Sequence, residues 1–363
     1  MNDSSKLSFT RRFTPRLWIL TAAAICLFPL PGSNPAYAGD TAPLFVDSHP
    51  LEVTINAPFD KIMRERSEDD EHEGTLVYTD ANGESVELTV NVRVRGKFRA
   101  RHDICDFAPL RLNFKKKQVK DTLFDDQDKV KLVTHCENKG AEHEQNVLKE
   151  YLAYRFLHTL SDLSFQTRLL RVTYVDSDSD RSRTKYGFIV EHEDELAKRV
   201  DADIAMVKSA EIDHLDVEQT NLFAVHAYFI GNTDFSAQLG PKEEFCCHNA
   251  VLLTREPGVY LPVPYDFDLS GIVDAPYAAP NPKYGIKRVT DRLYRGLCRD
   301  IDSLPATLQM FTDNRDEFES MIDNLDGLMR RTRVEVKDFI DDFYKDIRDE
   351  ASVERKLIET CSS

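Results

Sequence analysis

Alternating apolar and polar residues in the first half of the chain predict a series of β-strands. Residues 74–79 and 86–96 form a hairpin pattern, in which apolar side chains recur at every second position from Val86 to Val94. Asn82 and Gly83 lie between the two segments and readily adopt the positive φ angles of a tight turn. We therefore expect Val86, Leu88, Val90, Val92 and Val94 to share one buried face.

The rest of the first half is predicted to contain further strands, interrupted by one helix. The second half is predicted to be mainly helical. Apolar residues recur every three or four positions over residues 144–160, with Glu150 beside the apolar stripe. Further strands are expected at 110–114, 129–135, 167–175 and 186–193, and helices at 217–230, 305–312, 315–332 and 333–346, with two short strands near 251–254 and 259–267. Strands followed by helices predict an α+β protein of two lobes.

The N-terminal segment has the features of a cleaved secretory signal. Arg11, Arg12 and Arg16 precede an apolar run from Leu17 to Phe28, and Ala36-Tyr37-Ala38 has the small-x-small pattern of a signal-peptidase site. The run is shorter than the roughly 20 residues that span a bilayer. We expect a signal peptide at 1–38, a strand-rich lobe at 39–195 and a mainly helical lobe at 196–363. Such a chain would be periplasmic or secreted, with no transmembrane segment after cleavage.

Composition narrows the possible partners. The formal net charge of the full chain is −16, which argues against a uniformly basic surface for nucleic acid. Six cysteines remain beyond the predicted cleavage site, and disulfides are expected in an exported chain, but the sequence does not choose a pairing. Cys246-Cys247-His248 could bind a metal, but no second Cys/His pair follows at zinc-site spacing.

Two groups of residues are candidates for phosphate and metal chemistry. The segment RGKFRAR, residues 95–101, carries four cations around Gly96, and such a loop can hold phosphate or can be a solvated strand end. Asn232 and Asp234 follow a helix that ends at Gly231, and His248-Asn249 begins a strand. Asp266 and Asp268 end the next strand, where residues two apart point the same way and could share a Mg²⁺ or Mn²⁺ ion. Each of these residues is also common in ordinary turns.

Together these segments resemble the CotH family of atypical protein kinases, named for spore coat protein H. The similarity runs over residues 90–275 and rests mainly on Asn232-x-Asp234, Asn249 and Asp266-x-Asp268. It implies a bilobal protein-kinase-like fold, with Mg²⁺-dependent transfer of phosphate from ATP to Ser or Thr hydroxyls of a protein substrate.

The resemblance also implies a role for each candidate residue. Asp234 would be the catalytic carboxylate, and Asn249 and Asp266 would hold the metal ion, with Asp268 as the second carboxylate. The nucleotide-binding residues would be Arg95, Arg111, Glu150 and Glu191, where Glu150 pairs with a cation and Glu191 lies near the turn between lobes. Lys129 and Lys131, one strand after Arg111, are further candidate cations.

Two other functions fit the same motifs. A catalytically silent, kinase-like binding module would share every element and lack only phosphoryl transfer. A nucleotide-sugar transferase also uses Asp-x-Asp at a strand end, and this function predicts a parallel α/β sheet with an early Gly-rich turn.

Overall fold

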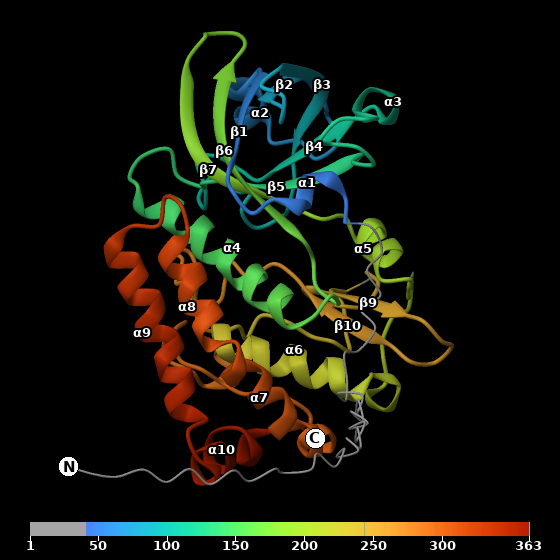
Figure 1. Cartoon of the computed structure of the whole chain (residues 1–363), viewed down its shortest axis with the longest axis vertical. Coiled ribbons are helices and arrows are strands. Elements are labelled where there is room, and N and C mark those ends of the chain that lie inside the picture. The colour runs from blue at the N-terminus through green and yellow to red at the C-terminus, as the bar shows by residue number, and fades with distance from the viewer. Residues whose placement is uncertain (1–40, 243, 363) are drawn as a thin grey trace, which may run out of the picture. The chain divides into compact units, whose positions relative to one another are not determined.

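The computed structural model describes residues 41–242 and 244–362, and the predicted signal peptide lies outside these residues. Among them, seven strands form a closed barrel in the order β1-β2-β3-β4-β5-β7-β6 (Figure 1). The strands are β1 (Leu51–Ala57), β2 (His72–Thr79), β3 (Ser85–Val94), β4 (Leu110–Phe114), β5 (Lys129–Val133), β6 (Thr167–Asp176) and β7 (Ser182–Val190). All neighbours pair antiparallel except β1 and β6, which pair parallel.

The predicted bilobal, protein-kinase-like fold is wrong, because the strands close into a barrel with helices after it. The sequence analysis missed β1, which pairs with β2 on one side and with β6 on the other. Its residues alternate between buried and more exposed positions, as expected for a strand with one face in a core. The strand joins what would otherwise be two sheet edges, and the sheet closes on itself.

The predicted hairpin is confirmed in its register. Leu76 pairs with Leu88, and the side chains of Leu88, Val90, Val92 and Val94 are buried inside the barrel. In the turn, Gly83 takes a φ of 82°, a left-handed conformation that glycine adopts at little cost. The buried valines belong to a core formed by the inward faces of all seven strands.

The predicted helices at 144–160, 217–230 and 305–312 are confirmed, but the predicted boundary between 315–332 and 333–346 is wrong, because one helix ends at Asn324 and the next begins at Arg330. The main ones are α4 (Glu142–Leu160), α6 (Val217–Ile230), α7 (Leu304–Asp313), α8 (Arg315–Asn324), α9 (Arg330–Asp346) and α10 (Glu350–Lys356). The shorter helices are α1 (Pro43–Val46), α2 (Phe59–Glu65), α3 (Lys116–Val119) and α5 (Glu193–Arg199). A small antiparallel sheet contains β8 (Asp203–Ile204), β9 (Ala250–Thr254) and β10 (Leu261–Pro264).

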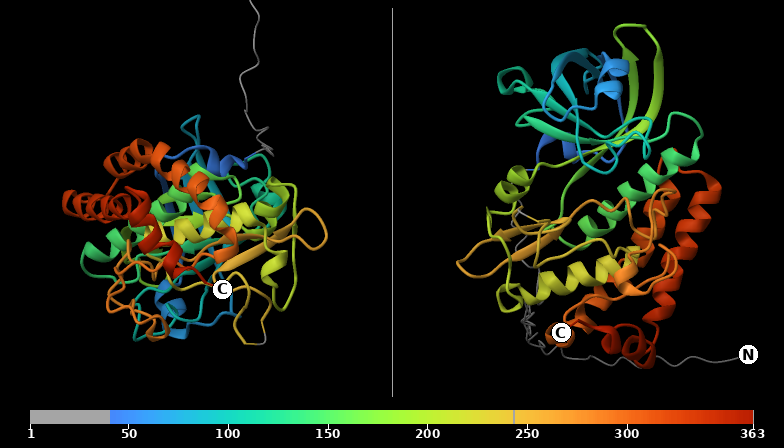
Figure 2. Two further views of the ribbon diagram at one scale, coloured as in Figure 1. Left: turned by 90° about the horizontal axis from the view of Figure 1, so that it is seen from below. Right: turned by 180° about the vertical axis from the view of Figure 1, so that it is seen from behind.

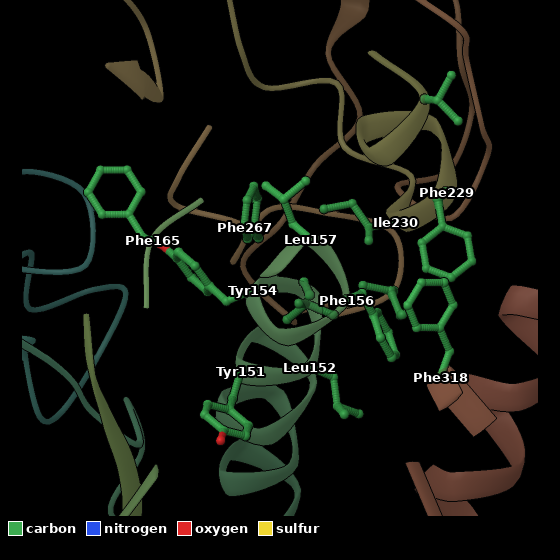
Figure 3. Close-up of a cluster of buried hydrophobic side chains, with 14 of the residues drawn as sticks. Tyr151, Leu152, Tyr154, Phe156, Leu157, Phe165, Phe229, Ile230, Phe267 and Phe318 are labelled. Carbon is green, nitrogen blue, oxygen red and sulfur yellow. The ribbon is translucent and has the colours of Figure 1, made fainter. Parts of the chain in front are cut away.

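Helix α4 lies between the barrel and α6, as seen in Figure 1 and from behind in Figure 2. Figure 3 shows its aromatic side chains inside a second core. Phe156 packs on Phe229 of α6 and Phe318 of α8, with ring centroids 5.5 and 5.0 Å apart. Tyr154 packs on Phe267, which follows β10, at 4.6 Å. Helix α4 is buried on nearly all sides, so it links the barrel rigidly to the segments after α6.

Within residues 41–242 and 244–362, three disulfides join Cys105 to Cys136, Cys246 to Cys247 and Cys298 to Cys361. They settle the pairing that the sequence left open, and they indicate a compartment outside the reducing cytoplasm. Within the described residues, no helix has both the length and the apolar character needed to cross a bilayer.

A buried histidine gives the α4–α6 contact a pH dependence. His226 of α6 is fully buried and its Nε2 lies 3.0 Å from the carbonyl oxygen of Ala153 in α4. Burial lowers the pKa of His226 to about 4, so the unfolded chain takes up the proton first as the pH falls. The contribution of the neutral imidazole to the free energy of unfolding is therefore complete above about pH 6.5, the pKa of this histidine in the unfolded chain. The contribution is lost as the pH falls toward 4.

We expect the stability advantage of the parent over His226→Gln to shrink by about 2 kcal/mol between pH 7 and pH 5. Gln can still donate to the Ala153 carbonyl but does not titrate, so the comparison isolates the imidazole from other ionisable groups. Urea unfolding of both proteins at the two pH values measures the difference. An advantage that stays constant with pH would show that His226 is not held neutral.

Candidate functional site

A pocket of about 330 Å³ brings together residues from distant parts of the sequence. One wall is the loop after β3, which contributes Arg95, Gly96, Lys97 and Arg99. The other wall contains the predicted polar residues Asp234, Asn249, Asp266 and Asp268. Cations therefore face hard oxygen donors across one cavity, whose volume is typical of small-molecule sites.

Asp234 is placed by the end of α6. Gly231 ends the helix in the left-handed conformation with a φ of 67°, and Asn232 then accepts a hydrogen bond from the backbone N–H of Asp234 at 2.9 Å. The Asp234 carboxylate meets His248 Nε2 at 2.9 Å and accepts a hydrogen bond from Asn249 Nδ2 at 3.0 Å. Both carboxylate oxygens are thus oriented, and the nearby carboxylate raises the pKa of His248.

Asp266 and Asp268 reach the pocket by a different geometry from the predicted one. Strand β10 ends at Pro264, and Asp266 has a left-handed φ of 63°, so the two residues do not alternate along a strand. The backbone N–H of Asp266 donates to Tyr154 Oη of α4 at 2.8 Å, which fixes the turn against the helix. The two side chains line one pocket because of this turn, although the strand argument that placed them together was wrong.

Asp268 is buried, and Tyr277 Oη donates to its carboxylate at 3.1 Å. Burial, followed by the charge of Asp266, raises the pKa of Asp268 to about 7, and Arg99 opposes this shift. A carboxylate in that range responds strongly to any added cation. Asp266 is half-buried, and its side chain is the more accessible of the two.

Arg99 is the cation that Glu150 meets. The guanidinium lies 3.6 Å from the Glu150 carboxylate, and both side chains are buried. Arg99 Nη2 also donates to the carbonyl oxygen of Thr134, while Nε is buried with no hydrogen-bond partner in the described residues. Burial and then the charge of Asp268 raise the pKa of Glu150, and the charge of Arg99 opposes this shift.

Two predicted nucleotide-binding residues lie elsewhere. Glu191 forms an ion pair with Arg199 at 2.8 Å, accepts a hydrogen bond from the backbone of Gln166, and borders another cavity. Arg111 of β4 is outside the lining of the pocket, although it neighbours Lys131 of β5 in register. Lys131 forms an ion pair with Glu193 at 2.7 Å.

The polar residues of the pocket fit the donor set of a magnesium ion. Mg²⁺ is usually held by one or two carboxylates, with phosphates and water completing an octahedron. Donors of this type are the carboxylates of Asp266 and Asp268 and the amide oxygen of Asn249. The Asn249 amide nitrogen donates to Asp234, so its oxygen remains available to a metal ion. Among the described residues, no three His, Cys, Asp or Glu side chains form a metal-binding group by themselves.

Tyr154 and Tyr277 were not predicted as parts of the site, and His248 was considered only as a metal ligand beside Cys246-Cys247 and as the start of a strand. His248 stands next to Asn249 in the sequence, but its contact with Asp234 depends on the antiparallel bridge between Ser236 and His248. Arg99 belongs to the RGKFRAR segment, which was predicted as a possible phosphate-binding loop. The burial of Arg99 against Glu150 was not predicted. None of the tyrosines has a sequence signal that distinguishes it from a core residue.

Comparison with known proteins does not assign the chain to a family. No family model matches it, and no curated protein matches it. The resemblance to the CotH family therefore stays a prediction.

Proposed function

We propose that this pocket catalyses Mg²⁺-dependent transfer of the terminal phosphate of ATP to a Ser or Thr hydroxyl of a protein, as the resemblance to the CotH family implies. The supporting observation is that Asp234, Asn249, Asp266 and Asp268 line one cavity opposite the basic loop at 95–99. These residues come from three separate segments, after α6, before β9 and after β10, and scattered turn formers would have no reason to converge.

The metal ion would be held by Asp266 and Asn249, with Asp268 behind them. When bound, it would neutralise negative charge on the transferring phosphate oxygens. The loop cations Arg95 and Lys97 would orient the phosphates from the other side, and the backbone N–H groups around Gly96 can approach them closely. Gly96 is exposed with a φ of 83°, and nothing lies within 4 Å of the position that a Cβ would take.

Asp234 is the residue best placed to act on the acceptor. His248 and Asn249 hold its carboxylate on the surface of the pocket, where it can orient the hydroxyl and accept its proton as the phosphorus–oxygen bond forms. Phosphoryl transfer depends chiefly on such positioning and on charge neutralisation. The buried Arg99–Glu150 pair connects the basic loop to α4, and the turn at Asp266 is held on the same helix through Tyr154.

We further propose that the chain acts after export, in the periplasm or outside the cell, following cleavage after Ala38. Its three disulfides support this location. Of the other functions, a nucleotide-sugar transferase requires a parallel α/β sheet, whereas the barrel is antiparallel except for β1 and β6. A silent binding module would use the same pocket without the transfer step.

A thermal-shift assay tests the binding half of the proposal. Mg-ATP at 100 times its dissociation constant should stabilise the protein by about 2.7 kcal/mol, and ATP with EDTA should stabilise it much less. A subsequent assay for labelled phosphate on a Ser/Thr-containing test protein separates an active enzyme from a silent binder. Equal melting temperatures with and without Mg-ATP would contradict both.

A further inference from the structure

Cationic side chains continue from the pocket along the outer face of the barrel. Arg93 of β3 pairs in register with Arg111 of β4, and Arg111 pairs with Lys131 of β5. Directly opposed residues project to the same face, with Cβ atoms about 5 Å apart. The alternate positions Val92, Leu112 and Val130 fill the barrel interior, so the cations face outward.

This row reaches the pocket through Arg95. Arg95 follows the end of β3 and lines the pocket itself. Arg95, Lys131 and Asp266 also line a small cavity directly beside it. We call Arg93, Arg95, Arg111 and Lys131 the cation ridge.

Two side chains of the cation ridge form ion pairs, and the other two, Arg95 and Arg111, form none within the described residues. Glu71 lies 3.8 Å from Arg93, and Glu193 lies 2.7 Å from Lys131. Arg111 is half-buried, and its Nε is buried without a hydrogen-bond partner among the described residues. Burial, and then the like charges of Arg93 and Arg95, lower the pKa of Arg111, and the charges of Glu193 and Glu68 oppose this shift. Crowded, under-paired guanidinium groups of this kind are suited to bind an anion.

The position of the ridge indicates which substrate it serves. The small cavity that joins the ridge to the pocket contains Asp266, the candidate metal ligand, and not Asp234, the candidate acceptor-side residue. The ridge therefore extends the side of the pocket where the phosphate donor would lie.

We propose that the cation ridge binds the phosphate chain of a donor longer than that of ATP, namely a linear polyphosphate. This inference rests on the proposed phosphoryl transfer. In the reaction, the bond between the terminal phosphorus and its bridging oxygen breaks, and a bond from the acceptor oxygen to that phosphorus forms. The electron pair stays on the bridging oxygen of the shortened chain, and the acceptor proton passes to Asp234.

Isothermal titration with Mg-tripolyphosphate and with a longer linear Mg-polyphosphate tests the inference. The parent should bind the longer chain at least about tenfold more tightly, the effect of one charge-assisted contact. Arg111→Gln should lose most of this preference while binding tripolyphosphate as the parent does. Arg171→Gln is the matched control, because Arg171 is an exposed arginine on the outer face of β6, away from the ridge.

Melting temperatures of all variants check folding, and Arg93→Gln replaces Arg111→Gln if the latter does not fold. Equal binding of both chain lengths by the parent would overturn the inference. So would a chain-length preference that Arg111→Gln and Arg171→Gln reduce equally. If Mg-ATP still binds and requires Asp266 in that case, the proposed function stands without the ridge; if neither ATP nor the polyphosphates bind, both proposals fail.

Discussion

Asp266→Asn is expected to abolish Mg-ATP binding while barely changing the stability of the protein. The amide carries no negative charge for the ion, and we expect Mg-ATP affinity to fall at least ~100-fold, as for the loss of a buried charged contact. The fold should tolerate the change, because Asn adopts the left-handed conformation that Asp266 occupies at a φ of 63°. The turn is held by its backbone N–H on Tyr154, which the substitution does not touch.

Asp274→Asn is a closely matched control for this experiment. Asp274 also has a left-handed backbone, with a φ of 47°, but it is exposed and does not line the pocket. Calorimetric titration of Mg-ATP should give the parent affinity for Asp274→Asn and no measurable heat for Asp266→Asn. Parent-like binding by Asp266→Asn would remove that residue from the metal site and would leave the phosphotransferase proposal without its main chemical support.

Asp234→Asn is expected to separate binding from chemistry. Its carboxylate faces the acceptor hydroxyl in our proposal, so Mg-ATP affinity should stay within a few-fold of the parent. The transfer rate should fall by ~10²–10⁴-fold, the usual contribution of a positioned general base. The Asn side chain can still receive a hydrogen bond from Asn249, which limits any structural disturbance.

Radiolabelled transfer to a Ser/Thr-containing protein, measured beside the calorimetric titration, checks both parts. Asp274→Asn again serves as the control and should transfer phosphate at the parent rate. A variant Asp234→Asn that transfers as fast as the parent would exclude Asp234 from the reaction. A variant that loses ATP binding as well would place Asp234 with the metal ligands.

Local patterns predicted most elements but not how the sheet closes. The hairpin register, α4 and α6 follow from the spacing of apolar residues within each segment. The barrel depends on β1, a short strand whose parallel pairing with β6 joins residues far apart in the sequence. No local pattern specifies such a pairing, and without β1 the remaining strands suggest an open lobe.

In the site, too, features set by local sequence could be predicted, and features set by distant contacts could not. Asn232-x-Asp234 could be located from the glycine that ends α6, because the helix stop and the following turn are local. The placement of Asp266 depends on a left-handed residue and on a hydrogen bond to Tyr154 of a distant helix. Glu150 could be expected to meet a cation, but only the folded loop shows that this cation is Arg99 rather than Arg111 or Lys131.

The position of a bound ion tests the central claim most directly. Manganese can replace magnesium at sites of oxygen donors, and its anomalous scattering locates it without ambiguity in crystals grown with Mn-ATP. We predict one or two manganese peaks in the pocket, with Asp266 and Asn249 supplying the nearest protein oxygens. Bound ATP with manganese elsewhere, or coordinated by neither residue, would contradict the proposed site.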